Sequence, residues 1–155
     1  MRPHQIPRPP SPREAPPPGA ISGDRVAAFE VTLVAGLEAP AAARAAVSAW
    51  VAGRLSDMLL ADAQLLVGEL VANSVRHADA PADAVVNVRA HVRADVLCLE
   101  VEDRGQTGSI ARRAPDLQHG GGFGLNLVDA VSRRWGVNRD LGTRVWAEIA
   151  FPAAA

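Results

Sequence analysis

A carboxylate and a carboxamide stand four residues apart, with only apolar residues between them, in the stretch Glu69–Ala78, which reads ELVANSVRHA. On an α-helix this spacing stacks Glu69 and Asn73 on one face, one turn apart. A carboxylate in that position can accept a proton from an attacking hydroxyl or water. A carboxamide oxygen is a neutral ligand that suits Mg²⁺, which binds oxygen atoms and retains several waters. The pair predicts a general base, Glu69, beside a metal ligand, Asn73.

A glycine run lies further along the chain, where His119–Leu125 reads HGGGFGL. It leads into a helical pattern, so Gly120, Gly122 and Gly124 free backbone N–H groups where the positive end of a helix dipole favours anions. No Gly-Lys-Ser/Thr follows, so the run is not a Walker-type P-loop. The pattern predicts a phosphate-binding helix start.

Other candidate ligands of a nucleotide lie at the ends of predicted strands. The acceptor-only carboxylate of Asp103 can take the exocyclic amine of adenine, and Gly105 lets the backbone pass beside the base. Thr143 can add a hydroxyl next to Asp103. Arginine is suited to the charge of a γ-phosphate, and the candidates are Arg76 on the helix and Arg112 and Arg113 in the later loop.

Each motif also has an ordinary structural explanation. Glu69 and Asn73 fit a surface pair on a helix, Asp103-Arg104-Gly105 fits a strand-end turn, and glycine runs can serve tight packing alone. The three tryptophans and Cys98 fit core positions. The occurrence of all these motifs in one order, on these elements, favours the functional interpretation.

Composition limits the class of protein. A chain of 155 residues suits one domain, and its net charge of −1 argues against capture of nucleic acid or anionic lipid as the main activity. No apolar run approaches the ~18 residues of a spanning helix. The single cysteine excludes an intrachain disulfide and fits a reducing cytoplasm. The four histidines are too far apart in sequence for a zinc motif, so no metal cluster is expected.

The N-terminal segment differs from the rest of the chain. Residues 1–23 contain eight of the twelve prolines and almost nothing apolar. Such a segment cannot bury enough surface to offset the entropy lost on ordering. The sequence therefore predicts a disordered proline-rich tail over 1–23 and one domain over 24–155.

Hydrophobic periodicity predicts the elements that position these residues. We expect strands over 29–35, 86–92, 97–103, 135–139 and 143–151, and three helices: one opened by Pro40, one with Asp62 as its N-cap that stops before Pro81, and one over 125–131. The aperiodic stretch 104–121 is typical of a binding loop. The order βααββαββ predicts an α+β fold, a two-layer sandwich with helices on one face of a mixed, mostly antiparallel sheet.

Together the motifs resemble the Bergerat-type, histidine kinase-like ATPase fold of gyrase, Hsp90, histidine kinases and MutL proteins. Glu69–Ala78 looks like its N box, Asp103-Arg104-Gly105 its first glycine box, and Gly120–Leu125 its second. The resemblance covers residues 25–152, and the short spacing between boxes is similar to that of anti-sigma-factor serine/threonine kinases and their single-domain relatives in actinobacteria. The first glycine box departs from the usual pattern, because Thr107 occupies its second glycine position.

The resemblance implies a function and a site. It implies ATP and Mg²⁺ as cofactors, Glu69 as the catalytic carboxylate and Asn73 as the Mg²⁺ ligand. Asp103 would read adenine. The remaining nucleotide-binding residues would be Arg76, Gly105, Gly120, Gly122, Gly124, Leu125 and Thr143.

Two functional hypotheses remain open. In the first, the protein is a serine/threonine kinase that binds a sigma factor and phosphorylates an anti-anti-sigma protein, and a homodimer is plausible. In the second, the ATP pocket is a structural relic and the protein acts only by binding a partner. The presence of both Glu69 and Asn73 favours the first. No dimerisation and phosphoacceptor module precedes the domain, so a complete histidine kinase is not expected.

Overall fold

The computed structural model describes residues 27–76, 83–93, 95–103, 122–138 and 142–152. Its elements follow the predicted order βααββαββ. They are β1 (Ala27–Val34), α1 (Ala39–Val51), α2 (Asp57–Arg76), β2 (Val85–Arg93), β3 (Val96–Asp103), α3 (Gly122–Val131), β4 (Arg134–Asn138) and β5 (Thr143–Ala150).

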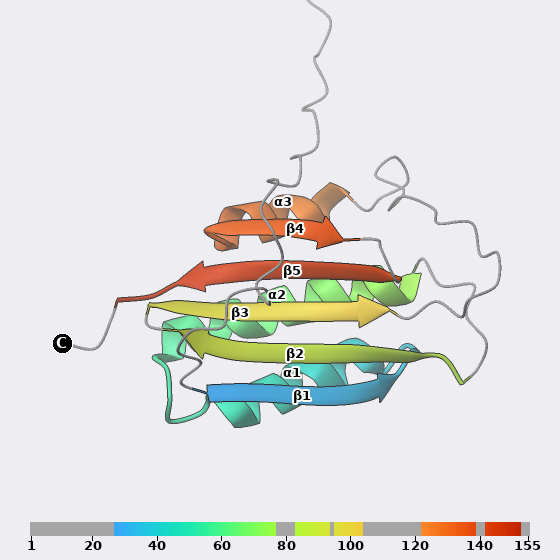
Figure 1. Cartoon of the computed structure of the whole chain (residues 1–155), viewed down its shortest axis with the longest axis horizontal. Helices are drawn as coiled ribbons and strands as arrows, with labels where there is room; N and C mark the ends of the chain where they lie inside the picture. Colours follow the sequence, from blue (N-terminus) through green and yellow to red (C-terminus); the bar gives the residue numbers. More distant parts are fainter. Residues whose placement is uncertain (1–26, 77–82, 94, 104–121, 139–141, 153–155) are drawn as a thin grey trace, which may run out of the picture.

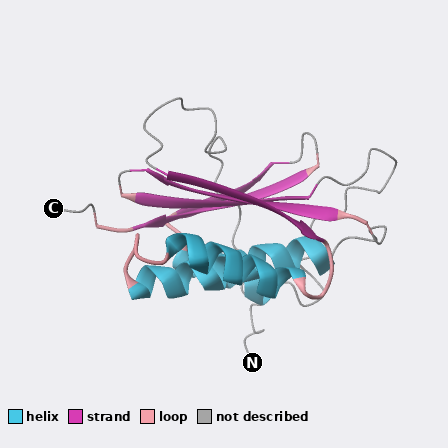
Figure 2. Cartoon of the chain, turned by 90° about the horizontal axis from the view of Figure 1, so that it is seen from below, coloured by secondary structure: helices cyan, strands magenta, loops and turns pink. Residues whose placement is uncertain are grey.

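The five strands form one sheet in the order β1-β2-β3-β5-β4 (Figure 1). Every pairing among the described strands is antiparallel. The three helices lie together against one face of this sheet, as the second view shows (Figure 2). The predicted α+β sandwich with a mostly antiparallel sheet is therefore confirmed.

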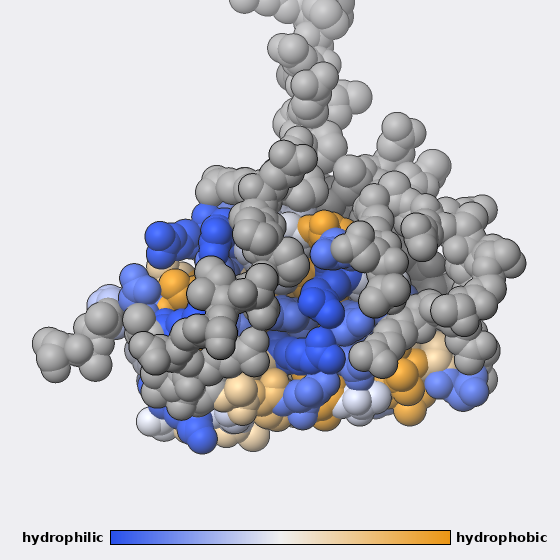
Figure 3. Space-filling model, viewed as in Figure 1, coloured by the Kyte–Doolittle hydropathy of each residue, from blue (hydrophilic) through white to orange (hydrophobic). Residues whose placement is uncertain are grey.

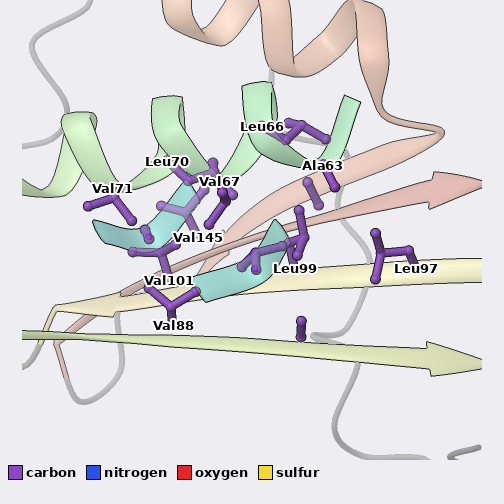
Figure 4. Close-up of a cluster of buried hydrophobic side chains, with 14 of the residues drawn as sticks. Ala63, Leu66, Val67, Leu70, Val71, Val88, Leu97, Leu99, Val101 and Val145 are labelled. Carbon is purple, nitrogen blue, oxygen red and sulfur yellow. The ribbon is translucent and has the colours of Figure 1, made fainter. Parts of the chain in front are cut away.

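The core lies between α2 and the central strands. Because successive strand residues point to opposite faces, every second residue of β2, β3 and β5 faces the helices. Figure 4 shows these side chains under one face of α2. The fully buried members include Leu66, Val67, Leu70 and Val71 on α2 and Val88, Leu97, Leu99 and Val101 on the strands. Burial of each such side chain stabilises the folded state by roughly 1.5–3 kcal/mol. Because the buried residues of α2 share one face, this burial fixes the rotation of the helix about its axis.

The N-terminus of α2 corrects one prediction. The helix begins at Asp57, so Asp62 lies inside it and is not its N-cap. Ser56 takes that role, because its Oγ accepts a hydrogen bond from the backbone N–H of Leu59 at 3.3 Å. The additional turn buries Leu59 in the core.

Helix α2 corrects the expectation that no apolar stretch approaches the length of a spanning helix. Its stretch Asp57–Val75 has a mean hydropathy of 1.3 and is long enough to cross a membrane by length and composition. In this structure the inward side of that stretch packs on the sheet, with Leu66 and Leu70 fully buried. A core helix satisfies the same criterion, so its hydropathy is explained by packing.

Candidate functional site

The predicted site residues that the structure describes converge on one end of the sandwich. In Figure 1 the C-terminal end of α2, the N-terminal end of α3, the end of β3 and the start of β5 all lie at the right. This follows from the topology, since β3 and β5 are antiparallel neighbours and α2 contacts both β3 and α3. Residues far apart in the sequence are thereby brought to a common edge.

Helix α2 lies between α1 and α3 and presents its polar pair toward α3. On its α1 side, Gln64 donates a hydrogen bond to Ser48 Oγ at 2.6 Å. At 100° per residue, Asn73 lies about 180° and Glu69 about 140° around the helix from Gln64. Both side chains are half-buried. The predicted carboxylate–carboxamide pair therefore borders the core on the flank away from α1.

Asp103 and Thr143 are direct cross-strand partners at the end of β3 and the start of β5. Both side chains lie on the helix-facing side of the sheet, because each is two residues from a buried core residue on its own strand: Val101 on β3 and Val145 on β5. The predicted hydroxyl next to Asp103 is thus in place. Asp103 is half-buried, and burial raises the pKa of its carboxyl above the ordinary value of 3.8. A partly desolvated acceptor stands on the inner face of the sheet.

The backbone at this end also fits the sequence prediction. Helix α3 begins at Gly122, inside the glycine run, and Gly124 and Leu125 are in its first turn. The first N–H groups of a helix have no partner within it, so they are available to an anion. Gly142, just before Thr143, has φ +121°, a conformation that favours glycine.

Several predicted residues lie outside the described part of the chain. These are Gly105, Gly120, Thr107, Arg112 and Arg113. Arg76 ends α2, but its side chain is not among those described. For these residues the roles assigned from the sequence remain predictions.

The site offers an oxygen donor that fits Mg²⁺. The half-buried carboxamide of Asn73 would hold the metal, and Glu69, one helical turn away, would be the proton acceptor beside it. An amide oxygen favours Mg²⁺ over softer metals.

Sequence reasoning missed a charged network on the opposite face of the sheet. Arg89 contacts Glu30 and Glu102 at 3.0 Å each, and Arg144 lies 3.5 Å from Glu102. In Figure 3 the described residues visible on this face are mostly hydrophilic. The strand register was the available signal, because it places Arg89 opposite both Glu30 and Glu100.

Comparison with known proteins gives an independent result. A family model described as "Histidine kinase-like ATPase domain" matches residues 33–149. No curated protein matches the chain. The matched region runs from the last two residues of β1 into β5 and includes Glu69, Asn73, Asp103 and the glycine run. The chain therefore belongs to the histidine kinase-like ATPase domain family.

Proposed function

We propose that the protein is a Mg·ATP-dependent serine/threonine kinase of the anti-sigma-factor type, which phosphorylates an anti-anti-sigma protein in the cytoplasm. Membership of a family that binds ATP with Mg²⁺ and includes anti-sigma-factor kinases supports this proposal. The observation that carries it is the position of Glu69 and Asn73 on the flank of α2 away from α1, in the C-terminal half of that helix, together with the Asp103–Thr143 pair.

Each residue has one role in this proposal. Asp103 accepts a hydrogen bond from the exocyclic amine of adenine, and the N-terminus of α3 binds phosphate oxygens. Asn73 holds Mg²⁺, which when bound neutralises phosphate charge. Glu69 accepts the proton of the partner's serine hydroxyl while the serine oxygen attacks the γ-phosphorus. The bond from that phosphorus to the bridging oxygen breaks, and ADP leaves.

The regulatory outcome follows from that transfer. Phosphorylation releases the anti-anti-sigma protein. The kinase, as a homodimer, then keeps the sigma factor sequestered. The alternative is a module that acts by protein binding alone. It is favoured by Thr107, which replaces the second glycine of the first glycine box.

Calorimetric titration with ATP, with and without Mg²⁺, tests the pocket first. The kinase proposal expects Mg-dependent binding in the micromolar range, which Asn73→Ala removes. Absence of binding at millimolar ATP would leave the protein-binding module.

The Glu69→Gln variant then tests phosphoryl transfer. It should still bind Mg·ATP and capture the partner but lose transfer to it, since Gln cannot accept the proton. If this variant phosphorylates the partner at the wild-type rate, the assigned role of Glu69 is wrong.

A further inference from the structure

Three potential metal ligands meet on the face of the sheet that is opposite the helices. The imidazole of His91, the thiol of Cys98 and the carboxylate of Glu100 have ligand atoms that all lie within 4.8 Å of one another. His91 and Cys98 are direct cross-strand partners in β2 and β3, and Glu100 follows on the same face of β3. The hairpin register creates this cluster, which is why the wide spacing of the histidines did not reveal it.

All three side chains are removed from solvent. His91 is 5% exposed, Cys98 is 0% and Glu100 is 6%. Burial is ordinary for a cysteine, whereas buried histidine and glutamate side chains require compensating interactions, and Arg144 lies 4.0 Å from Glu100.

We propose that His91, Cys98 and Glu100 form a site for a zinc-like divalent metal, separate from the nucleotide site. Nitrogen, thiolate and carboxylate ligands together match Zn²⁺, and Mg²⁺ disfavours such a set. Tetrahedral Zn²⁺ places neighbouring ligand atoms roughly 3.3–3.8 Å apart. Side-chain rotations that move these atoms by about 1 Å would close the site.

A cavity of about 400 Å³ leads to this cluster. His91 and Glu100 line it, together with Glu30, Arg89 and Arg144. It gives the metal an entry path and leaves room for a water as fourth ligand. Three protein ligands and one open position are typical of a metal that also binds an exogenous group.

The charges around the cluster are balanced. Arg144 lies 4.0 Å from Glu100, whereas Arg93 and Arg134 are bound by Glu148, the cross-strand partner of Cys98 on β5. Burial raises the pKa of the Cys98 thiol, so the metal must displace its proton to form the sulfur–metal bond. The thiolate offsets one of the two charges of the metal, the released proton enters solvent, and the site gains one net positive charge next to the Glu100 carboxylate.

Cobalt titration of the full chain tests the proposal. Co²⁺ substitutes for Zn²⁺, and a cobalt–thiolate bond gives a charge-transfer absorption band in the near ultraviolet. Cys98 is the single cysteine of the chain, so any such band must come from it. We expect one Co²⁺ per chain, the band, and its disappearance when Zn²⁺ is added.

Variants test the ligand set. His91→Gln and Glu100→Gln should each weaken Co²⁺ binding roughly 100-fold. Loss of a residue that only supports a ligand already weakens metal affinity by about 10–100-fold, and loss of the ligand itself should weaken it at least as much. Glu30 lines the same cavity but is not part of the cluster, so the Glu30→Gln variant should bind Co²⁺ as tightly as wild type does. Absence of the thiolate band in excess Co²⁺ would refute the site, without the need for any variant to fold. Unchanged affinity in both Gln variants would refute these ligands. Neither result bears on Mg·ATP binding.

Discussion

At the scale of single residues, Asp103 is the proposed adenine-binding residue, and burial changes its chemistry. Its carboxylate ends β3 on the helix-facing side, beside Thr143, and its pKa is raised by desolvation. A partly desolvated carboxylate is unfavourable for the protein alone, and perturbed groups of this kind gather at functional sites. An adenine amine would provide the hydrogen bond that compensates for the lost water.

Asp103→Asn should therefore weaken ATP binding and change the pH dependence of stability. A neutral acceptor binds the amine less strongly than a carboxylate, so we expect roughly 10-fold lower affinity by calorimetry. Because the folded-state pKa of Asp103 is raised, the contribution of this group to stability is greatest below pH 3.8 and falls as pH rises through the folded pKa. The other carboxylates are common to both proteins, so the difference in free energy of unfolding between wild type and variant, measured in urea across that range, should show this loss. Equal affinities would contradict adenine reading.

Gly136 is a position at which one contact, with the ring of Trp146, favours glycine over any larger residue. A Cβ added there would lie 2.8 Å from the ring of Trp146, which is 1% exposed on the neighbouring strand. Gly136→Ala should lower the free energy of unfolding by about 1–3 kcal/mol through overpacking. Gly36→Ala is the matched control, because nothing lies within 4 Å of its added Cβ. Similar urea midpoints for both variants would show that the ring moves freely.

At the scale of elements, one buried carboxylate joins three strands. Glu148 on β5 accepts hydrogen bonds from Arg93 of β2 at 3.0 Å and from Arg134 Nη2 of β4 at 2.8 Å. Its side chain is 2% exposed, and Arg134 also lies over the ring of Trp146. The carboxylate thus connects β4 to β2 across the two strands between them.

Glu148→Gln should destabilise the sheet far more than a surface substitution. Breaking a buried ion pair costs about 3–5 kcal/mol, but both arginines are partly exposed, so we expect about 2–3 kcal/mol. Glu30→Gln removes an ion pair with a 56% exposed carboxylate and should cost below about 1 kcal/mol. Chemical denaturation of the two variants measures the difference. Equal losses would mean that the network contributes nothing beyond its surface charges.

The sequence predicted the elements well, because they depend on local patterns, whereas the roles of the site residues stay predictions. Alternation located the strands, and the pairing of Asp103 with Thr143 followed from placing both at strand ends. The start of α2 was missed because Ser56 and Asp62 are both good N-caps, and only the burial of Leu59 decides between them. The outer-face network was missed because its partners, such as Arg93 and Glu148, meet only through the strand order.

At the scale of the whole molecule, the two proposed sites lie on opposite sides of the sheet. Glu69 and Asn73 of α2 and Asp103 of β3 belong to the helix side, whereas His91, Cys98 and Glu100 lie on the opposite face among arginines and glutamates. A hard, weakly bound metal with ATP and a softer metal with thiolate would therefore occupy different sites. The buried strand β3 lies between them and contributes residues to both.

Thermal unfolding should report the two sites independently. A ligand that binds only the folded state stabilises it by about 2.7 kcal/mol at 100 times its Kd, so saturating Mg·ATP should raise Tm by several degrees. Asn73→Ala should lose this rise and keep the one produced by Zn²⁺. Cys98→Ser should show the reverse. The sites share no ligand, so the two shifts in the wild-type protein should add within about 0.5 kcal/mol. Loss of both shifts in either variant would show that the faces are coupled through β3.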